Sequence, residues 1–343
     1  MDRLVAMDLS TWHDLRARDP RRLVLGSAQW GMTYGIANRD GAPDDAELAR
    51  LLARAHAAGV HTIDTARAYG ESERRIGRAL AGADLRVWRV LTKLGPDVHE
   101  PGLDVATTLE RTTASLAASR NALGLDVLPL VLLHRFAHRH ACGGRLWRFL
   151  LAEREAGRID TLGVSAATPE EAWAALEDPD VSAIQVATSL LDLRLHRQGF
   201  FPRARELGRT IYVRSVFLQG VAHLEPATLP GFLAPLRESI EQVRAVAARL
   251  GVPSRALYLA FVRGLPGVQP VLGCEREAQL AELLADWTSE AVDAASLTPL
   301  VEVLPTHDAA LVDPSRWPTA ASNAAAAGPP NQTAAAGVAT IPR

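Results

Sequence analysis

The sequence predicts an α/β fold of the (β/α)8 TIM-barrel type. Short apolar runs alternate with helical patterns eight times along the chain. The length of 343 residues allows two average domains or one barrel of about 250 residues with extensions. Reactive side chains stand directly after several of the apolar runs, where a barrel builds its active site. Eight buried strands with helices between them favour a closed parallel barrel over an open sheet, which seldom needs so many equal units.

Each expected unit begins with an apolar run of strand length and continues into a segment with apolar residues at helical spacing. The expected strand and helix pairs are 23–25 with 44–57, 62–63 with 73–80, 87–91 with 105–123, 127–133 with 146–156, 159–164 with 169–176, 183–186 with 203–207, 211–213 with 236–250, and 268–272 with 278–284. An additional helix is expected at 254–264, because Pro253 marks its start.

We divide the chain into a lead-in of residues 1–21, a barrel domain of residues 22–304 and a low-complexity tail of residues 305–343. Ala, Pro, Gly, Asn and Thr dominate the end of the tail, and such a mixture buries too little apolar area to offset its ordering entropy. We therefore expect the tail to be disordered, with Trp317 as the last anchored residue.

Composition excludes several classes of protein. With 48% hydrophobic and 22% charged residues the chain can bury a full core, and a net charge of −2 gives no footprint for nucleic acid. No apolar run is long enough to span a membrane, and the first residues lack a hydrophobic signal region. Two cysteines, Cys142 and Cys274, are too few for a disulfide framework, so we expect a cytoplasmic protein. The oligomeric state is not indicated.

Lys93 is the only lysine in the chain. One alternative is chance survival in a sequence that otherwise replaces lysine with arginine. Its position favours a function instead, because Lys93 stands where a short apolar strand ends before Gly95 and Pro96. Lysine is a compact ammonium whose pKa can shift, whereas arginine is a planar fork that stays charged. We therefore expect Lys93 at the catalytic face.

Three further groups follow expected strands: Asp64 and Tyr69 after the second, and His134 after the fourth. Together with Lys93 they fit the donation of a proton to a carbonyl oxygen while hydride arrives from elsewhere. A phenol with a pKa near ~10 is a poor acid at neutral pH unless a cation stabilises the phenolate, which Lys93 can do. Asp64 would hold Lys93 charged, and His134 would hydrogen-bond the substrate oxygen.

The sequence resembles the aldo-keto reductase superfamily, in particular a bacterial branch often associated with carbohydrate metabolism. The resemblance covers about residues 22–290 and rests on the segments 26–32 (GSAQWGM), 63–73 (IDTARAYGESE), 91–93 (LTK), 132–134 (LLH), 163–165 (GVS), 184–185 (IQ) and 214–220 (RSVFLQG). It implies that Asp64, Tyr69, Lys93 and His134 are a catalytic tetrad, and that a nicotinamide dinucleotide binds without a separate Rossmann domain.

The same resemblance implies a cofactor site along one side of the barrel mouth. Gln185 is expected beside the nicotinamide carboxamide, 215–220 along the pyrophosphate and 273–279 around the adenosine. The full expected set is Gly26, Ser27, Ser165, Gln185, Arg214, Ser215, Gln219, Gly220, Gly273, Cys274, Glu275, Arg276 and Gln279.

The chain departs from the family's usual pattern at three points. Arg214 stands where many members have an aromatic residue that stacks on nicotinamide, and its guanidinium could stack or bind phosphate. Ser165 is followed by Ala166 where many have Asn, and the acidic Glu275 lies near the adenosine phosphate. A helix start offers amides to phosphate, and Arg276 can bind the extra phosphate of NADP(H) if Glu275 points to solvent. We expect NADP(H), with NAD(H) as the alternative.

The sequence therefore predicts an NAD(P)H-dependent reductase of an aldehyde or ketone, with Tyr69 as general acid and a small carbonyl or alcohol substrate. Trp30 and Met32 would line a substrate pocket or pack the barrel mouth. No metal is expected, because the His134 to Cys142 stretch lacks a ligand partner elsewhere. Two alternatives stay open: a Schiff-base lyase that uses Lys93, and a non-enzymic regulator that senses the dinucleotide.

Overall fold

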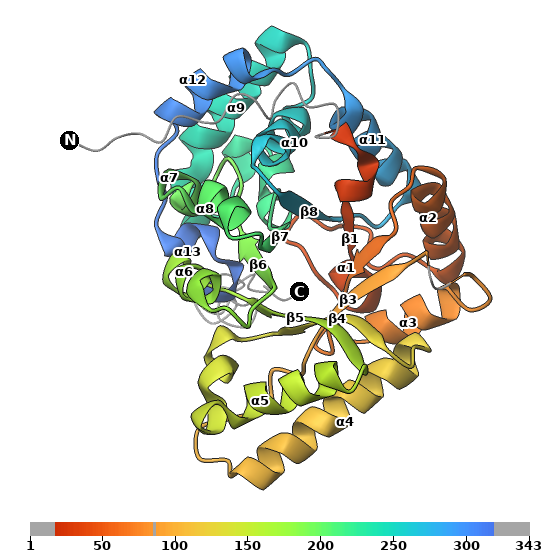
Figure 1. Ribbon diagram of the computed structural model, residues 1–343. Helices are drawn as coiled ribbons and strands as arrows, with labels where there is room; N and C mark the ends of the chain where they lie inside the picture. Colours follow the sequence, from red (N-terminus) through yellow and green to blue (C-terminus); the bar gives the residue numbers. More distant parts are fainter. Residues whose placement is uncertain (1–17, 85–86, 319–343) are drawn as a thin grey trace, which may run out of the picture.

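The computed structural model describes residues 18–84 and 87–318. Within them, eight parallel strands form a closed barrel in sequence order, and the last strand pairs with the first (Figure 1). The strands are β1 (Val24–Gly26), β2 (Thr62–Asp64), β3 (Arg89–Lys93), β4 (Leu128–Leu133), β5 (Ile159–Ser165), β6 (Ala183–Ala187), β7 (Thr210–Arg214) and β8 (Val268–Gly273). The predicted (β/α)8 barrel is confirmed.

Helices surround the barrel as an outer layer (Figure 1). They are α1 (Ala28–Gly31), α2 (Asp45–Ala57), α3 (Ser72–Ala79), α4 (Val105–Leu123), α5 (Ala141–Glu155), α6 (Pro169–Glu177), α7 (Arg194–Arg197), α8 (Phe200–Glu206), α9 (Arg237–Leu250), α10 (Ser254–Gly264), α11 (Glu277–Thr288), α12 (Ala294–Val303) and α13 (Ala309–Val312). The sequence pattern did not indicate α1, α7, α12 or α13. Three of these have only four residues, too few to show a helical period.

Local sequence signals start several of the long helices. The side chain of Asp44 accepts a hydrogen bond from Glu47 N before α2, and Asp104 caps α4 in the same way. Thr168 caps α6, which begins with Pro169. These caps fix where each helix leaves its loop, and therefore fix the loops that surround the barrel mouth.

Alternation along the strands decides which side chains enter the barrel. Leu91 belongs to a small cluster inside the barrel, with Val24, Leu130, Leu132, Ala183 and Tyr212. Because side chains two residues apart on a strand share a face, Lys93 points to the interior as Leu91 does. The same rule takes Gln185 inward after Ala183. The carboxyl ends of β3 and β6 thus deliver polar groups to one mouth of the barrel.

The folded part of the chain extends beyond the predicted end of the barrel domain at residue 304. Residues 305–318 pack on the barrel: Val312 is buried, and the Trp317 ring lies 5.8 Å from that of Phe232. His307 Nε2 lies 2.9 Å from Ser239 Oγ on α9. Apolar packing and polar contacts thus attach a segment whose composition resembles a tail. The predictions for residues 1–17 and 319–343 lie outside the described residues.

The start of the described chain is also attached to the barrel. Asp19 carbonyl oxygen accepts from Trp287 Nε1 at 3.2 Å, although residues 18–21 were assigned to the lead-in. In the part of the chain that the structure covers, no single helix is long and apolar enough to cross a membrane. Taken together, the bent pair Gly231–Leu250 and Ser254–Gly264 meets the requirement for a membrane span by length and composition alone.

Candidate active site

Two polar side chains and one backbone carbonyl oxygen surround the Lys93 ammonium inside the barrel mouth. Lys93 Nζ donates to Asp64 Oδ1 at 2.7 Å, to the Thr65 carbonyl oxygen at 3.1 Å and to the Tyr69 hydroxyl at 3.3 Å. The lysine side chain is only 1% exposed. All three ammonium hydrogens therefore have an acceptor, and the ammonium connects a carboxylate to a phenol away from solvent.

Lys93 is positively charged in this environment. Burial by itself lowers the pKa of Lys93, because it disfavours the charged form. The adjacent Asp64 and Tyr69 act in the opposite direction and outweigh burial, so the pKa of Lys93 lies above its ordinary value. A permanent ammonium beside the Tyr69 hydroxyl stabilises negative charge on that oxygen.

Gln185 from β6 holds the other side of the Asp64 carboxylate. Gln185 Nε2 donates to Asp64 Oδ1 at 2.7 Å, so this oxygen accepts from both an amide and an ammonium. Gln185 Oε1 is buried and has no hydrogen-bond partner among the described residues. A buried amide oxygen without a donor is costly, and a ligand N–H would satisfy it.

Tyr69 reaches Lys93 from the loop between β2 and α3. This loop is tied to β3 because Arg67 N donates to the Lys93 carbonyl oxygen at 3.1 Å. It also contacts the end of α1 closely: a Cβ at Gly31 would lie 2.0 Å from the Tyr69 carbonyl oxygen. Only glycine allows this approach, so Gly31 sets the position of the loop that carries Tyr69.

His134 lies beside Tyr69 as a neutral imidazole. The ring centroids are 6.1 Å apart and the planes nearly perpendicular, at 88°. Burial, followed by the charges of Lys93 and Arg214, lowers the pKa of His134 to about 3. His134 Nδ1 is buried without a hydrogen-bond partner in the described chain. A neutral ring has one N–H, so His134 can donate a hydrogen bond but cannot serve as an imidazolium acid.

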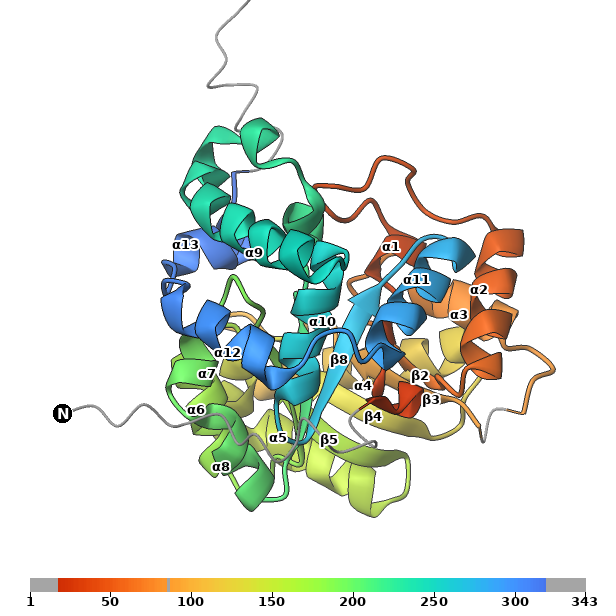
Figure 2. The same ribbon diagram turned by 90° about the horizontal axis from the view of Figure 1, so that it is seen from above.

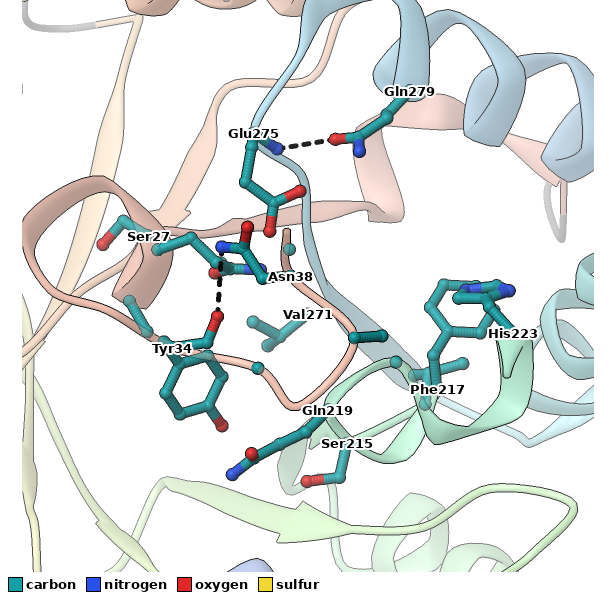
Figure 3. A pocket seen from close by; sticks show the side chains of 18 of the residues that line it. Ser27, Tyr34, Asn38, Ser215, Phe217, Gln219, His223, Val271, Glu275 and Gln279 are labelled. Carbon is teal, nitrogen blue, oxygen red and sulfur yellow. Dashed lines mark hydrogen bonds between the residues drawn. The ribbon is translucent and has the colours of Figure 1, made fainter. Parts of the chain in front are cut away.

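A cavity of about 550 Å³ runs from Asp64 and Tyr69 to the start of α11 (Figure 3). This volume lies within the usual range for small-molecule sites. The predicted site residues that line it are Gly26, Ser27, Asp64, Tyr69, Arg214, Ser215, Gln219, Gly220, Gly273, Glu275 and Gln279. Lys93, Gln185 and His134 lie next to its catalytic end through their contacts with Asp64 and Tyr69.

The middle of the cavity is enclosed by two segments far apart in sequence. One is residues 31–43, here called the strap, and the other is the loop after β7. Ser215 and Gln219 in that loop have left-handed backbones, with φ of 62° and 54°. The strap contacts it through Ala37, whose N lies 3.5 Å from the Gln219 carbonyl oxygen. A Cβ at Gly220 would lie 2.5 Å from Ala37 Cβ, so the contact requires glycine.

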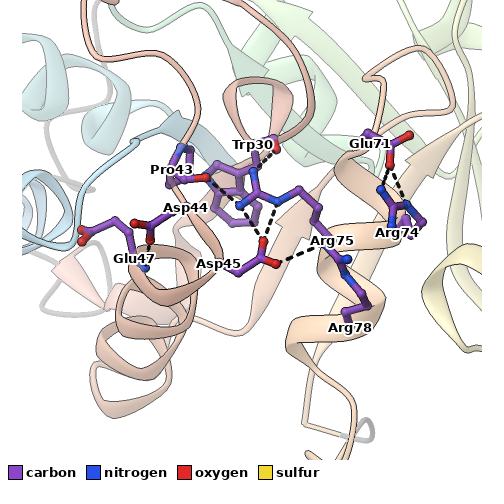
Figure 4. A network of polar contacts seen from close by, with 9 residues as sticks. All are labelled: Trp30, Pro43, Asp44, Asp45, Glu47, Glu71, Arg74, Arg75 and Arg78. Atoms are coloured by element: carbon purple, nitrogen blue, oxygen red, sulfur yellow. Dashed lines mark hydrogen bonds and ion pairs between the residues drawn. The ribbon is translucent and has the colours of Figure 1, made fainter.

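Arg75 on α3 fastens both ends of the strap (Figure 4). Its guanidinium donates to the Trp30 carbonyl oxygen and to the Pro43 carbonyl oxygen, each at 2.6 Å, and pairs with Asp45 at 2.9 Å. Figure 2 shows the strap, in orange, extending toward the segment before α9. The strap is thus held at its ends by α3 and in the middle by the β7 loop.

Glu275, Arg276 and Gln279 do not have the arrangement that the sequence suggested at the far end of the cavity. Glu275 lines the cavity, and its carboxylate points toward Asn38 (Figure 3). The Arg276 side chain is 37% exposed and lies 3.7 Å from Asp40 Oδ2, and it is absent from the cavity lining. Gln279 Oε1 accepts from Glu275 N at 2.7 Å and from Arg276 N at 3.0 Å.

The first amide of α11 is also engaged. Glu277 N donates to Glu47 Oε1 at 2.6 Å, so a carboxylate from α2 lies at the positive end of α11. This backbone hydrogen bond, together with Arg50, lowers the pKa of Glu47. The amides at the start of α11 were expected to be available to a phosphate, and these three are already bonded to side chains.

Four other predicted residues lie outside the cavity lining. Trp30 is fully buried and its Nε1 donates to the Cys274 carbonyl oxygen at 2.9 Å, so the structure uses it as packing. Burial raises the pKa of the Cys274 thiol, which packs in the core. Met32 is 40% exposed on the strap, and Ser165 is buried at the end of β5. A short helix such as α1 turns its one large apolar residue to the core.

Several residues in the cavity lining were missed by sequence reasoning: Tyr34, Asn38, His223, Arg255 and Glu282. Tyr34 lies on the strap near Gln219, and burial raises its pKa. No periodicity or motif marks these residues in the sequence. Beyond Gly31 the strap has no regular secondary structure, and Glu282 does not differ in pattern from other glutamates on helices. Only the approach of these segments to each other brings them to the cavity.

Comparison with known proteins places this site in a family. A model of the Aldo/keto reductase family matches residues 22–301. The chain belongs to this family. The match spans nearly the whole barrel domain predicted from the sequence, so the resemblance to aldo-keto reductases is confirmed.

Two bacterial relatives illustrate the range of this family. An aldo-keto reductase of Mycobacterium sp. (strain JLS) is 38% identical over 130 residues, which cover 37% of this chain and 43% of the relative. The chain thus aligns with less than half of that mycobacterial protein. A D-threo-aldose 1-dehydrogenase of Pseudomonas sp. is 27% identical over 308 residues, 78% of this chain and 92% of the relative.

Solved structures agree with the barrel. An aldo-keto reductase of Pseudomonas aeruginosa has a TM-score of 0.56 at 26% identity, covering 79% of this chain and 90% of the other. The glycerol dehydrogenase of Gluconobacter oxydans has a TM-score of 0.65 at 22% identity, covering 85% and 94%. At that identity the second likeness concerns the fold alone.

Proposed function

We propose that this aldo/keto reductase family member is an NAD(P)H-dependent oxidoreductase that reduces an aldehyde or ketone, or runs the reverse oxidation. The observation that carries the proposal is the Lys93 ammonium, buried between Asp64 and the Tyr69 hydroxyl. This arrangement suits a proton transfer from a phenol, which needs an adjacent cation to act near neutral pH.

In the proposed reaction, a reduced nicotinamide supplies the hydride that adds to the carbonyl carbon. Tyr69 donates its proton to the carbonyl oxygen, so the product is an alcohol and the residue becomes a phenolate. Lys93 stabilises this phenolate until a proton from water restores it, and Asp64 keeps the ammonium in place. Neutral His134 donates a hydrogen bond to the substrate oxygen and orients it toward Tyr69.

The residues present fit a nicotinamide dinucleotide. Gln185 Oε1, buried and without a donor in the described chain, lies where a carboxamide N–H could bond it. Ser215 and Gln219, with left-handed backbones, line the middle of the cavity where a pyrophosphate would lie. Arg214 also lines it, and its hydrogen bonds within the described chain go only to Ser215 Oγ and the Ala166 carbonyl oxygen.

A polyhydroxylated substrate is the class we favour. The relative from Pseudomonas sp. is named for an aldose, a compound rich in hydroxyl groups. Sugar-like carbonyl compounds and polyols are therefore the first substrates to test. Both cysteines, Cys142 and Cys274, are free thiols, which supports a reducing, cytoplasmic setting.

The two alternative functions have less support. A Schiff-base lyase needs a neutral amine, whereas Lys93 donates three hydrogen bonds and its pKa is raised. A dinucleotide-sensing regulator would not need a buried ammonium aimed at a phenol. No feature of the described residues favours either alternative.

The test is a screen of aldehydes, ketones, aldoses and polyols that follows nicotinamide absorbance, with Tyr69→Phe as the matched variant. The wild-type protein should turn over at least one class, and Tyr69→Phe should lose about 10²-fold or more of the chemical step while binding the dinucleotide normally. Binding of dinucleotide without any turnover would favour the sensor. A borohydride-trapped substrate adduct on Lys93 would favour the lyase.

The expectation of NADP(H) rested on the usual cofactor of the superfamily that the sequence resembles and on Arg276 binding the additional phosphate. The proposed reaction is the same with NAD(H) or NADP(H), because both carry the same nicotinamide. The choice between them depends on the far end of the cavity.

A further inference from the structure

The cavity has two ends. The proposed function, on which this inference rests, places the nicotinamide and the substrate at the end near Tyr69. The nicotinamide must lie near Tyr69 for hydride and proton to reach the same carbonyl group. The second nucleotide of the cofactor therefore extends along the cavity to its other end, here called the distal end. Glu275 and Gln279 at the start of α11 mark the distal end, and Asn38 of the strap lies beside Glu275 (Figure 3). Arg39, Asp40, Arg255 and Glu282 are further charged residues of the cavity lining.

NADP(H) differs from NAD(H) by one phosphate on the 2′-oxygen of the adenosine ribose. A phosphate is recognised by arginine forks and by free backbone amides, and a carboxylate at the same place repels it. A free 2′-hydroxyl instead favours a carboxylate, which accepts its hydrogen bond. The distal end can therefore be judged by which of these groups it presents.

The backbone amides at the start of α11 are already occupied. Glu275 N and Arg276 N both donate to Gln279 Oε1, and Glu277 N donates to the Glu47 carboxylate. A phosphate at this helix start would have to displace the Gln279 amide and would meet Glu47. The arrangement satisfies the helix end from within the protein and leaves these donors closed to a ligand anion.

The cations of the distal end are mostly engaged by carboxylates. Arg276 Nε lies 3.7 Å from Asp40 Oδ2 and outside the cavity lining. Arg255 lines the cavity but pairs with Asp286 and, at 3.2 Å, with Glu282. Arg39 is the exception: it is exposed on the strap, lines the cavity and has no ion pair recorded within the described chain.

Asp40 and Glu282 also line the cavity but pair with Arg276 and Arg255, whereas Glu275 lines it without an ion pair within the described chain. It directs its oxygens toward Asn38 across the distal end (Figure 3). We propose that the distal end of the cavity selects NAD(H) over NADP(H), with the Glu275 carboxylate accepting a hydrogen bond from the adenosine ribose and repelling a 2′-phosphate. This proposal reverses the expectation of NADP(H) drawn from the sequence.

The test measures dissociation constants of NADH and NADPH with the full chain and no substrate, by nucleotide fluorescence. The wild-type protein should bind NADH at least about tenfold more tightly than NADPH, as expected for one repulsive contact at a partly screened site. Glu275→Gln should narrow this ratio to about threefold or less, chiefly by strengthening NADPH. Glu241→Gln on the exposed face of α9 removes the same charge from a residue outside the cavity lining and should leave the ratio unchanged.

Ionic strength provides a second readout. Salt screens the repulsion between the Glu275 carboxylate and the 2′-phosphate of NADPH. Added salt should therefore weaken the binding of NADPH less than expected from its additional charge. The ratio of the two dissociation constants should therefore approach one as salt rises in the wild-type protein, and should respond less in Glu275→Gln.

Equal or tighter binding of NADPH by the wild-type protein overturns the proposal. If Arg39→Gln then abolished that NADPH preference, the exposed arginine of the strap would be the phosphate ligand. Failure of both nucleotides to bind contradicts the proposed function as well, whereas tight NADPH binding with turnover contradicts the NAD(H) selection alone.

Discussion

The two ends of the cavity are built in different ways. At the catalytic end, Asp64, Lys93 and Gln185 come from neighbouring or facing strands, are buried, and are joined by hydrogen bonds of 2.7 Å. At the distal end, Glu275 and Asp40 stand on loops, and the ion pair of Arg276 with Asp40 is largely exposed. One end is a rigid network within the barrel, and the other is an assembly of loop ends.

This difference separates chemistry from selectivity. Buried charges in a network interact strongly and tolerate little change, because a lost partner leaves an uncompensated charge. Exposed pairs contribute little to stability and can be exchanged. We therefore expect substitutions at the catalytic end to alter the reaction step and substitutions elsewhere along the cavity to alter nucleotide binding.

The largest effect is expected at Lys93. Lys93→Arg keeps the charge but changes its shape and reach, so the hydrogen bonds to Asp64 and Tyr69 cannot both be kept. The chemical step, measured by single turnover, should fall by about 10² or more, while nucleotide affinity stays within about threefold. Because arginine is larger than the buried site allows, Lys93→Met serves as a second variant that fits by size. Near-normal turnover in either variant would remove Lys93 from the mechanism.

A smaller effect, on nucleotide affinity and not on the chemical step, is expected from a substitution in the middle of the cavity. Gly220→Val places a side chain against Ala37 and strains a backbone with φ of 87°. The strap should shift, and both NADH and NADPH should bind about tenfold more weakly, with the chemical step at saturation nearly unchanged. Gly251→Val at the end of α9 is the control for backbone strain, since its φ is 65° and no atom lies near its Cβ position. Equal losses in both variants would mean that the strap contact is irrelevant.

Removal of the segment after α12 is expected to lower the stability of the barrel. A chain ending at Leu304 loses Val312 and Trp317, which pack under the segment before α9. Its melting temperature should fall by about 3 °C, as expected for the loss of about 2 kcal/mol in a protein of this size. Composition predicts that a chain ending at Pro318 keeps the original melting temperature. A similar fall in both truncated chains would show that residues 319–343 also stabilise the barrel.

The smallest expected effect is that of pH on His134. Its pKa is lowered to about 3, so the imidazole is already neutral above pH 5 and gains no proton near its ordinary value of 6.5. The pH profile of the chemical step should therefore show no inflection near 6.5 that depends on this residue. An inflection near pH 6.5 in the wild-type protein that disappears in His134→Gln would mean that His134 acts as an imidazolium. It would also mean that the catalytic end is more exposed to solvent than the structure indicates.

Much of the catalytic end was predictable because it depends on local patterns. Apolar runs located the strands, and the residues after them gave Asp64, Tyr69, Lys93 and His134. The strand boundaries were less secure: β3 begins at Arg89 and ends on Lys93, two residues later than expected at each end. This shift does not move Lys93 from the mouth, because alternation with Leu91 still turns it inward.

The sequence by itself determined the eight-unit barrel, the family and the four candidate catalytic groups at the barrel mouth, because strand alternation and strand ends are properties of neighbouring residues. Only the tertiary structure decided that Glu275 faces the cavity while Arg276 pairs with Asp40, and that Trp30 is packing. The reason is physical: those outcomes depend on contacts between segments far apart in sequence, such as Glu47 with Glu277, which no local pattern encodes.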